Sequence, residues 1–279
     1  MRMSPSQLIE RAQAAEAAGF LGIAGMDHLA PPRAEQQPMY SAMPTNVWLA
    51  AHTSRLVVSS LVLSDPFRHP AVLAQEAVTL DHFSGGRFEL GIGWGSGTHE
   101  LEPFSVTADS GARRVRRLQE TIEVLKALWT GNPVDYDGEF FQLRGAQQAA
   151  VPLGRIPLVI GGAGPKTMEL VAAHADWWNL HIGILDRFEE MRDRAGDARI
   201  SIEHMVAFVP SEDRRAEVAG LAAKRFGTLG VFTGSSNEVI DFFGGLADKG
   251  VERIYAWFTD FAHPDTLAAF GETVIPALR

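Results

Sequence analysis

The sequence predicts an α/β fold, specifically a parallel (β/α)8 barrel that lacks its first strand. Short β-branched runs alternate with amphipathic helical segments along the chain, which is the pattern of parallel strands joined by crossover helices. The length of 279 residues is close to the roughly 250 residues of a single barrel domain. The composition is 46% hydrophobic and 21% charged, as in globular proteins. We therefore expect one domain over residues 1–279.

The first helix is expected to begin at Ser4, with Pro5 in its first turn, and to end at Gly19. A buried strand over 20–25 follows it. Further barrel strands are expected at 55–62, 87–93, 156–161, 177–181, 200–209 and 253–258. The helices that alternate with the strands are expected at 45–53, 70–83, 110–130, 165–175, 186–195, 212–226, 236–249 and 264–277.

One segment breaks this alternation. Within residues 131–156, Asp137-Gly138 separates two strand-like runs, and this dipeptide is typical of a tight hairpin turn. We therefore expect a β-hairpin excursion there. The barrel strands then number seven, and no strand precedes the helix at Ser4. Either the barrel is open at this seam, or translation starts upstream of Met1, or one strand escapes the pattern.

Composition excludes several classes of function. The chain contains no cysteine, which rules out disulfides, thiolate metal sites and a cysteine nucleophile. The net charge is −9 without a basic run, so we expect neither nucleic acid nor a membrane as a partner. The nine histidines are scattered without metal-ligand spacing, so no metal site is expected. The N-terminus has no apolar signal region, which favours a cytoplasmic location.

Function in a parallel barrel gathers at the carboxyl ends of the strands. The polar and glycine-rich segments at those ends are Asp27-His28, Ser60-Leu61-Val62, residues 91–97, residues 161–164, Asn179 and His181. A lone Asp-His pair is often only a turn cap and a surface histidine, and glycines in such turns often serve backbone geometry alone.

Residues 161–164 (GGAG) favour function over that simpler interpretation. They lead from a strand into a helix that opens at Pro165, and backbone N–H groups at a helix N-terminus bind phosphate readily. The segment is neither a Walker loop nor a Rossmann fingerprint, because the required spacing is absent. The residues alone thus predict a barrel that binds a phosphate-bearing ligand, and they do not identify the reaction.

Two charged clusters remain ambiguous from the sequence. Arg113, Arg114, Arg116 and Arg117 place positive charge at a helix N-terminus, against the helix dipole. They indicate an acidic neighbour, an anionic cofactor tail, or simply a solvated face. Glu100 and Glu102, after the third strand, form either a solvated rim or part of a pocket mouth.

Two blocks of sequence resemble a known family. Residues 67–87 read FRHPAVLAQEAVTLDHFSGGR and lead to LGIG at 90–93, and residues 157–162 read PLVIGG and lead to ADWWN at 175–179. With smaller matches at 26–29 (MDHL) and 128–131 (LWTG), they run through nearly the whole chain. The chain resembles the bacterial luciferase-like monooxygenase family, and most of all its branch that depends on coenzyme F420.

The resemblance implies a (β/α)8 barrel, usually dimeric, that binds a flavin or deazaflavin across its mouth and acts on a small organic molecule. His28 is then the candidate for proton transfer beside a hydride step, because an imidazole titrates near neutral pH. A cis peptide between Leu61 and Val62 is expected under the ring. The residues expected to bind the cofactor are Asp27, Ser60, Leu61, Val62, Gly93, Trp94, Gly161, Gly162, Ala163 and Gly164.

Three functions remain open at this point. The first is hydride transfer between coenzyme F420 and a small organic substrate, the second is a monooxygenase that uses reduced FMN and O2, and the third is a non-catalytic flavin-binding relative. Two departures argue against a hexose phosphate as the substrate. The sugar dehydrogenases of the family carry a glutamate where this chain has Ser96, and a tryptophan where it has Pro31-Pro32.

Overall fold

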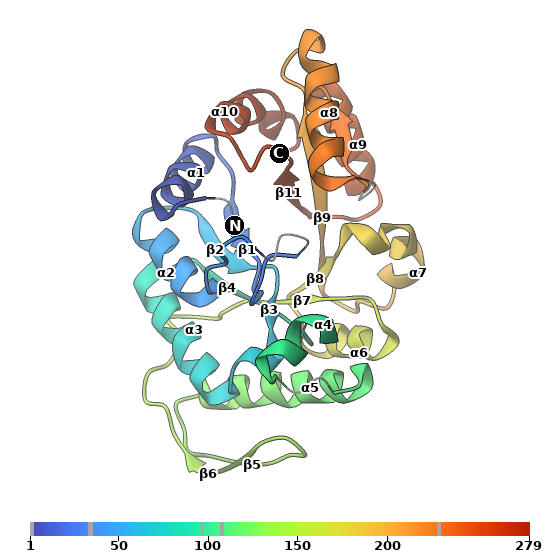
Figure 1. Ribbon diagram of the computed structural model, residues 1–279. Coiled ribbons are helices and arrows are strands. Elements are labelled where there is room, and N and C mark those ends of the chain that lie inside the picture. The colour runs from blue at the N-terminus through green and yellow to red at the C-terminus, as the bar shows by residue number, and fades with distance from the viewer. Residues whose placement is uncertain (1–2, 33–35, 96, 107–108, 228–229) are drawn as a thin grey trace.

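The computed structural model describes residues 3–32, 36–95, 97–106, 109–227 and 230–279. Its parallel strands form a nearly closed barrel surrounded by helices, as expected (Figure 1). Around the barrel the strands follow the order β1 (Gly22–Gly25), β2 (Val57–Ser60), β4 (Phe88–Gly93), β7 (Leu158–Gly161), β8 (Trp177–Leu180) and β9 (Arg199–Phe208). The short strand β3 (Leu63–Ser64) pairs with β4, and both β10 (Phe232–Gly234) and β11 (Arg253–Phe258) pair with β9.

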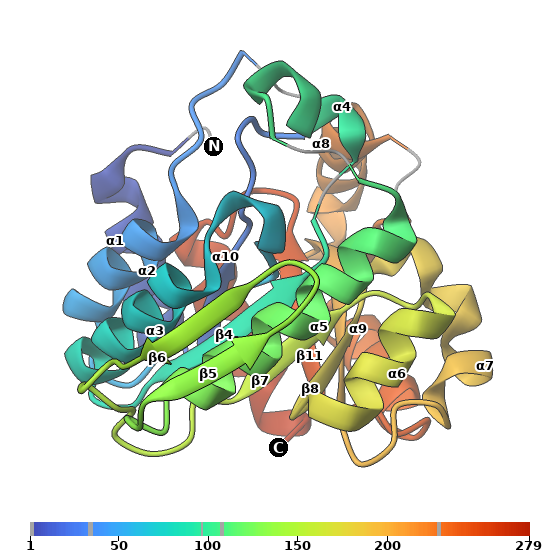
Figure 2. The ribbon, with the colours of Figure 1, turned by 90° about the horizontal axis from the view of Figure 1, so that it is seen from below.

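The helices lie outside the strands. They are α1 (Pro5–Ala17), α2 (Ala42–Ala51), α3 (Pro70–Ser84), α5 (Gly111–Leu128), α6 (Pro165–His174), α7 (Phe188–Arg192), α8 (Arg215–Phe226), α9 (Ser236–Ala247) and α10 (Pro264–Thr273). The short helix α4 (Thr98–Leu101) follows β4 at the mouth of the barrel (Figure 2). No helix in the described ranges is long and apolar enough to cross a membrane.

Helix ends follow the local sequence signals. Ser4 and Gln7 form a capping box at the start of α1, and α3 ends at Gly85, whose φ of 66° is left-handed. Other boundaries differ from expectation. Helix α2 begins three residues before the expected residue 45, after Ser41. The strand expected over 55–62 is shorter, because β2 ends at Ser60, and the separate strand β3 begins only after Leu61-Val62.

The seam of the barrel lies between β1 and β11. In the described part of the chain, β1 pairs only with β2 and β11 only with β9, so no strand bridges them. The helix layer covers this side instead. Phe20, just before β1, stacks on Phe270 of α10 at 5.6 Å and meets Phe258 of β11 edge-on at 6.0 Å. All seven expected barrel strands are present, and β3 and β10 are additional.

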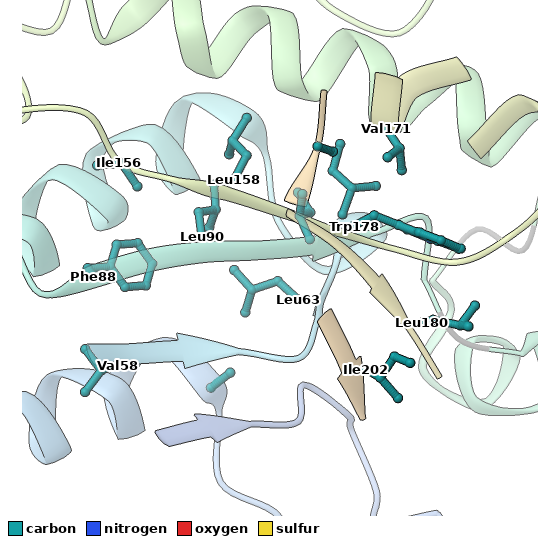
Figure 3. Close-up of a cluster of buried hydrophobic side chains, with 14 of the residues drawn as sticks. Val58, Leu63, Phe88, Leu90, Ile156, Leu158, Val171, Trp178, Leu180 and Ile202 are labelled. Carbon is teal, nitrogen blue, oxygen red and sulfur yellow. The ribbon is translucent and has the colours of Figure 1, made fainter. Parts of the chain in front are cut away.

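The apolar core fills the space between the strands and the helices. Figure 3 shows Val58, Leu90 and Leu158 from neighbouring strands together with Val171 from α6. The expected hairpin forms from β5 (Val134–Asp137) and β6 (Gln142–Ala146), lies against α5 (Figure 2), and adds Val134 and Leu143 to the core. Glu120 of α5 holds it, because its carboxylate accepts backbone N–H groups from residues 139–141.

Candidate active site

The floor of the barrel mouth is built around the side chain of Val62. A methyl group placed on Gly93 would lie 2.8 Å from Val62 Cγ2, and one placed on Gly161 would lie 3.3 Å from both Val62 methyl carbons. The two glycines therefore make room for this side chain between β4 and β7. The peptide bond between Leu61 and Val62 is cis, as the resemblance predicted. Leu61 is tied to the neighbouring strand because its N–H donates to the carbonyl of Gly25 at 2.8 Å.

Asp27 is buried directly after β1 and is committed to protein partners. Arg68 donates to both of its carboxylate oxygens, at 2.6 and 3.1 Å, and the N–H of Ser64 donates to Oδ2 at 3.0 Å. A bidentate arginine pair is among the strongest charged contacts in proteins. Asp27 thus ties the end of β1 to the segment that carries Val62. This geometry favours a positioning role, and a direct contact with cofactor stays a prediction.

His28 meets a carboxylate that lies 72 residues away in sequence. Its Nδ1 donates to Glu100 Oε2 at 2.8 Å, and the N–H of Leu29 donates to Glu100 Oε1 at 2.6 Å. Glu100 lies in α4 and is buried, so it belongs to the mouth and not to a solvated rim. An ionised carboxylate can only accept hydrogen bonds, so the neutral His28 ring carries its proton on Nδ1 and its basic lone pair on Nε2.

The glycine turn after β7 has the local geometry that an anion site would need. Gly161 ends the strand, Gly164 caps α6, and Gly162 has a φ of 118° that favours glycine. The turn is held in place because Trp178 Nε1 donates to the carbonyl of Gly162 at 2.7 Å. Backbone N–H groups of a helix N-terminus and a positive dipole end suit a phosphate group. The residues 161–164 therefore fit the phosphate of a flavin-type cofactor, and this assignment stays a prediction.

Two other residues expected to bind the cofactor, Trp94 and Ser60, differ in where their side chains lie. Trp94 lies beside the glycine turn, with its Nε1 3.7 Å from the position of a methyl group on Gly162, and Arg114 lies over its ring at 4.5 Å. Ser60 turns away from the mouth, because its hydroxyl accepts a hydrogen bond from Asn46 of α2 at 3.0 Å. A direct role of the Ser60 side chain in cofactor binding is therefore not supported by this geometry. Ser96 lies outside the described residues.

The arginines at the start of α5 have acidic neighbours. Arg113 and Arg116 both pair with Glu139 of the hairpin turn, and Arg117 pairs with the buried Asp65. Of the alternatives left open by the sequence, these contacts favour an acidic neighbour. Asp65 also accepts a hydrogen bond from a threonine of α5, and burial raises its pKa.

Sequence reasoning missed Arg68 and the role of Glu100. Arg68 belongs to the block that carries the resemblance, and no local pattern links it to Asp27. Glu100 and Glu102 are equivalent in the sequence, yet Glu102 is exposed in the structure. A carboxylate that pairs with a distant histidine has no signal in a single sequence. Within the described residues there is no group of three or more candidate metal ligands.

Comparisons with known proteins agree with this architecture. The family model described as luciferase-like monooxygenase matches residues 1–261. The chain is 32% identical over 231 residues to a protein of Mycolicibacterium fortuitum named F420-dependent glucose-6-phosphate dehydrogenase, which covers 78% of this chain and 68% of that protein. The protein of the same name from Mycolicibacterium smegmatis is 35% identical over 179 residues, which cover 63% of this chain and 53% of that protein.

Solved structures share the fold. An F420-dependent secondary alcohol dehydrogenase in complex with an F420-acetone adduct superposes with a TM-score of 0.84 at 20% identity, over 100% of this chain and 96% of that chain. The oxygenating constituent of 3,6-diketocamphane monooxygenase from Pseudomonas putida, in complex with FMN, gives a TM-score of 0.81 at 14% identity, over 100% and 96%. The barrel, its mouth and the family match lead to one conclusion: the chain belongs to the luciferase-like monooxygenase family.

Proposed function

We propose that this protein is an oxidoreductase that moves a hydride between coenzyme F420 and a small organic substrate with a hydroxyl or carbonyl group. The observation that carries the proposal is the pair of half-buried His28 and buried Glu100 at the barrel mouth, 2.8 Å between Nδ1 and Oε2. Such a pair suits a group that must hold and release one proton. The relatives named as F420-dependent dehydrogenases support the choice of cofactor.

The mouth supplies places for the parts of such a cofactor. The amides at the start of α6 would hold its phosphate, and the surface made by Val62, Gly93 and Gly161 would support the flat ring. The bound coenzyme supplies the hydride acceptor or donor. Asp27 and Arg68 keep the Val62 segment in place, so the floor is preorganised before ligand arrives.

His28 handles the proton. When an alcohol is oxidised, the hydroxyl proton passes to His28 Nε2 while Glu100 stabilises the imidazolium that forms. In the reverse direction His28 returns the proton to the carbonyl oxygen. Glu100 also accepts the N–H of Leu29, so one carboxylate fixes both the ring and the backbone beside it.

A reduced-FMN monooxygenase is the second candidate, because solved structures with this fold include an FMN-bound oxygenase. The experiment that separates the two is a parallel anaerobic titration of the protein with oxidised and reduced F420 and FMN, followed by fluorescence. Tight binding of F420 alone supports hydride transfer. A preference for reduced FMN, with O2 uptake on addition of air, overturns it. Binding of F420 without turnover of any alcohol or ketone points to a non-catalytic relative.

The role of Glu100 has its own test. In Glu100→Gln, we expect the nitrogen-15 shifts of His28 to show a mixture of ring tautomers, and kcat to fall while F420 affinity stays unchanged. Glu102→Gln is the matched control, because this exposed carboxylate lies two residues away. Unchanged His28 shifts in Glu100→Gln would contradict the proposed positioning.

We further propose a homodimer formed through α2 and α3, with the chain acting as one cytoplasmic domain over residues 1–279. Trp48 of α2 is 45% exposed and Phe83 of α3 is 70% exposed, and large apolar side chains on neighbouring helices favour an interface. Light scattering of the wild type and of Phe83→Asp measures the mass directly. A monomeric wild type would contradict the dimer.

A further inference from the structure

The side chain of Glu203, in the middle of β9, faces the inside of the barrel. The next residue, His204, meets Phe242 of α9 edge-on at 4.8 Å, and Phe208 meets Phe270 of α10. Even-numbered residues of this strand therefore face the helix layer, and odd-numbered residues face inward. Ser201 confirms the alternation, since its hydroxyl donates to the Asn179 side chain at 3.0 Å.

Glu203 lies at the mouth end of the barrel. The last paired residues of β8 and β9 are Leu180 and Ile202, so Glu203 is one residue beyond this pair, where β8 has ended. His181 follows β8, and its Nε2 lies 4.0 Å from Glu203 Oε2. The side chain of Glu203 remains 15% exposed, which leaves it within reach of a small molecule. Tyr255 of β11 is its register partner on the other side.

No arginine or lysine in the described part of the chain forms an ion pair with Glu203. Arg253 also faces inward, but Glu89 binds it through both carboxylate oxygens, at 2.5 and 3.0 Å. Arg225 of α8 donates to the carbonyl of Thr259, which follows β11. Burial raises the pKa of Glu203 to about 7 and lowers the pKa of His181. The carboxyl group of Glu203 therefore changes charge near neutral pH, while the lowered pKa of His181 favours its neutral form.

We propose that Glu203 and His181 form the recognition site for the substrate, and that it selects an uncharged hydroxyl compound over a phosphate ester. The proposal rests on the proposed hydride-transfer function. A carboxyl group can hydrogen-bond a hydroxyl group in both of its protonation states, as donor when protonated and as acceptor when ionised. A phosphate dianion beside an ionised carboxylate without a cation is repelled, and burial strengthens that repulsion.

The test compares D-glucose with D-glucose 6-phosphate, which differ only in the charged group. Reduction of F420 gives kcat/KM for each at pH 6, 7 and 8. In the wild type the ratio of glucose to its phosphate is expected to exceed about tenfold at pH 8 and to shrink toward pH 6 as Glu203 takes up a proton. In Glu203→Gln the ratio should fall by about tenfold at pH 8.

Two comparisons isolate Glu203 in this experiment. Titration of the phosphate itself, whose second pKa is about 6, affects the wild type and Glu203→Gln alike and cancels between them. Glu252→Gln removes an exposed carboxylate at the opposite end of the barrel, where Glu252 pairs with Arg199, and should leave the ratio unchanged. A wild type that prefers the phosphate, or a Glu203→Gln variant with the wild-type ratio, overturns the recognition site.

A second readout does not depend on turnover. Infrared difference spectra of wild type minus Glu203→Gln report the protonated carboxyl band of Glu203 at pH 6. D-glucose is expected to shift this band at a lower concentration than D-glucose 6-phosphate does. If F420 is never reduced but the band responds to glucose at the lower concentration, the recognition site stands and the proposed function falls. If F420 is reduced but neither the band nor the ratio responds, the recognition site falls alone.

Discussion

Two carboxyl groups inside the same barrel have opposite surroundings. Glu89, near the start of β4, is bound bidentately by Arg253, whose guanidinium also lies 3.8 Å from the ring centre of Trp177. Glu203, at the mouth, has the neutral His181 at 4.0 Å and no such cation in the described chain. Burial alone lowers the pKa of Arg253, but its contacts with Glu89 and Tyr255 outweigh burial and raise it.

This difference separates stability from function along the barrel axis. At the amino ends of the strands, charge is neutralised by a partner across the barrel, so the pair closes the interior without reacting. At the carboxyl ends lie two imidazole–carboxyl contacts, His28 with Glu100 and His181 with Glu203, and burial raises the pKa of Glu203 to about 7. Barrel enzymes in general place chemistry at the second of these ends. Substitutions at the two ends should therefore have different consequences.

The largest effect is expected at the mouth. His28→Ala removes the proton acceptor and should lower kcat by about 100- to 10,000-fold, while leaving the melting temperature close to the wild-type value because the side chain is not in the core. Steady-state F420 reduction and calorimetry measure the two quantities. A variant that keeps wild-type kcat would show that the proton goes elsewhere.

A substitution at the amino ends of the strands should lower the stability of the protein instead of its activity. Arg253→Met leaves Glu89 buried without its cation, which costs about 3–5 kcal/mol of unfolding free energy. Chemical denaturation measures the loss, and F420 affinity at low temperature should be retained. The double variant Glu89→Gln/Arg253→Met is the control and should recover much of the loss. Equal stability of the single and double variants would argue that the ion pair itself is unimportant.

The third prediction concerns Glu203 and the way in which the free energy of unfolding depends on pH. Burial raises the pKa of Glu203 from its ordinary value of 4.5 to about 7, so the folded state binds a proton more tightly than the unfolded chain does. Stability should therefore fall as pH rises from about 4.5 to 7. Glu203→Gln lacks this loss and should be more stable than the wild type at pH 8, by up to about 3 kcal/mol. Identical pH dependence in the two proteins would rule out the raised pKa.

The smallest effect concerns the floor under the ring. Gly93→Ala places a methyl group 2.8 Å from Val62 Cγ2, so Val62 must shift, and F420 affinity should weaken by roughly tenfold. Gly244→Ala in α9 is the matched control, because nothing lies within 4 Å of the new methyl group. It should raise stability by about 0.5–1 kcal/mol without affecting the cofactor. Fluorescence titration compares the two variants.

Much of the fold is predictable because its signals are local. The caps at Ser4 and Gly85, the apolar stripe of α5 and the Asp137-Gly138 turn each act within a few residues. The three-residue strand β10 escaped prediction, since it is too short to show a period. The strand expected over 55–62 ends instead at Ser60, and Val62 packs against Gly93 and Gly161, which are distant in sequence.

The candidate site was only partly predictable for the same physical reason. Residue identities and their order place His28 and the 161–164 turn at strand ends, and parallel strands bring those ends together. Which carboxylate meets which partner depends on contacts between segments far apart in sequence. The contacts of Glu100 with His28 and of Arg68 with Asp27 arise only when the barrel closes, because Coulomb energy and desolvation depend on distance in space. The same holds for Glu203, which has no arginine or lysine partner among the residues that the structure describes.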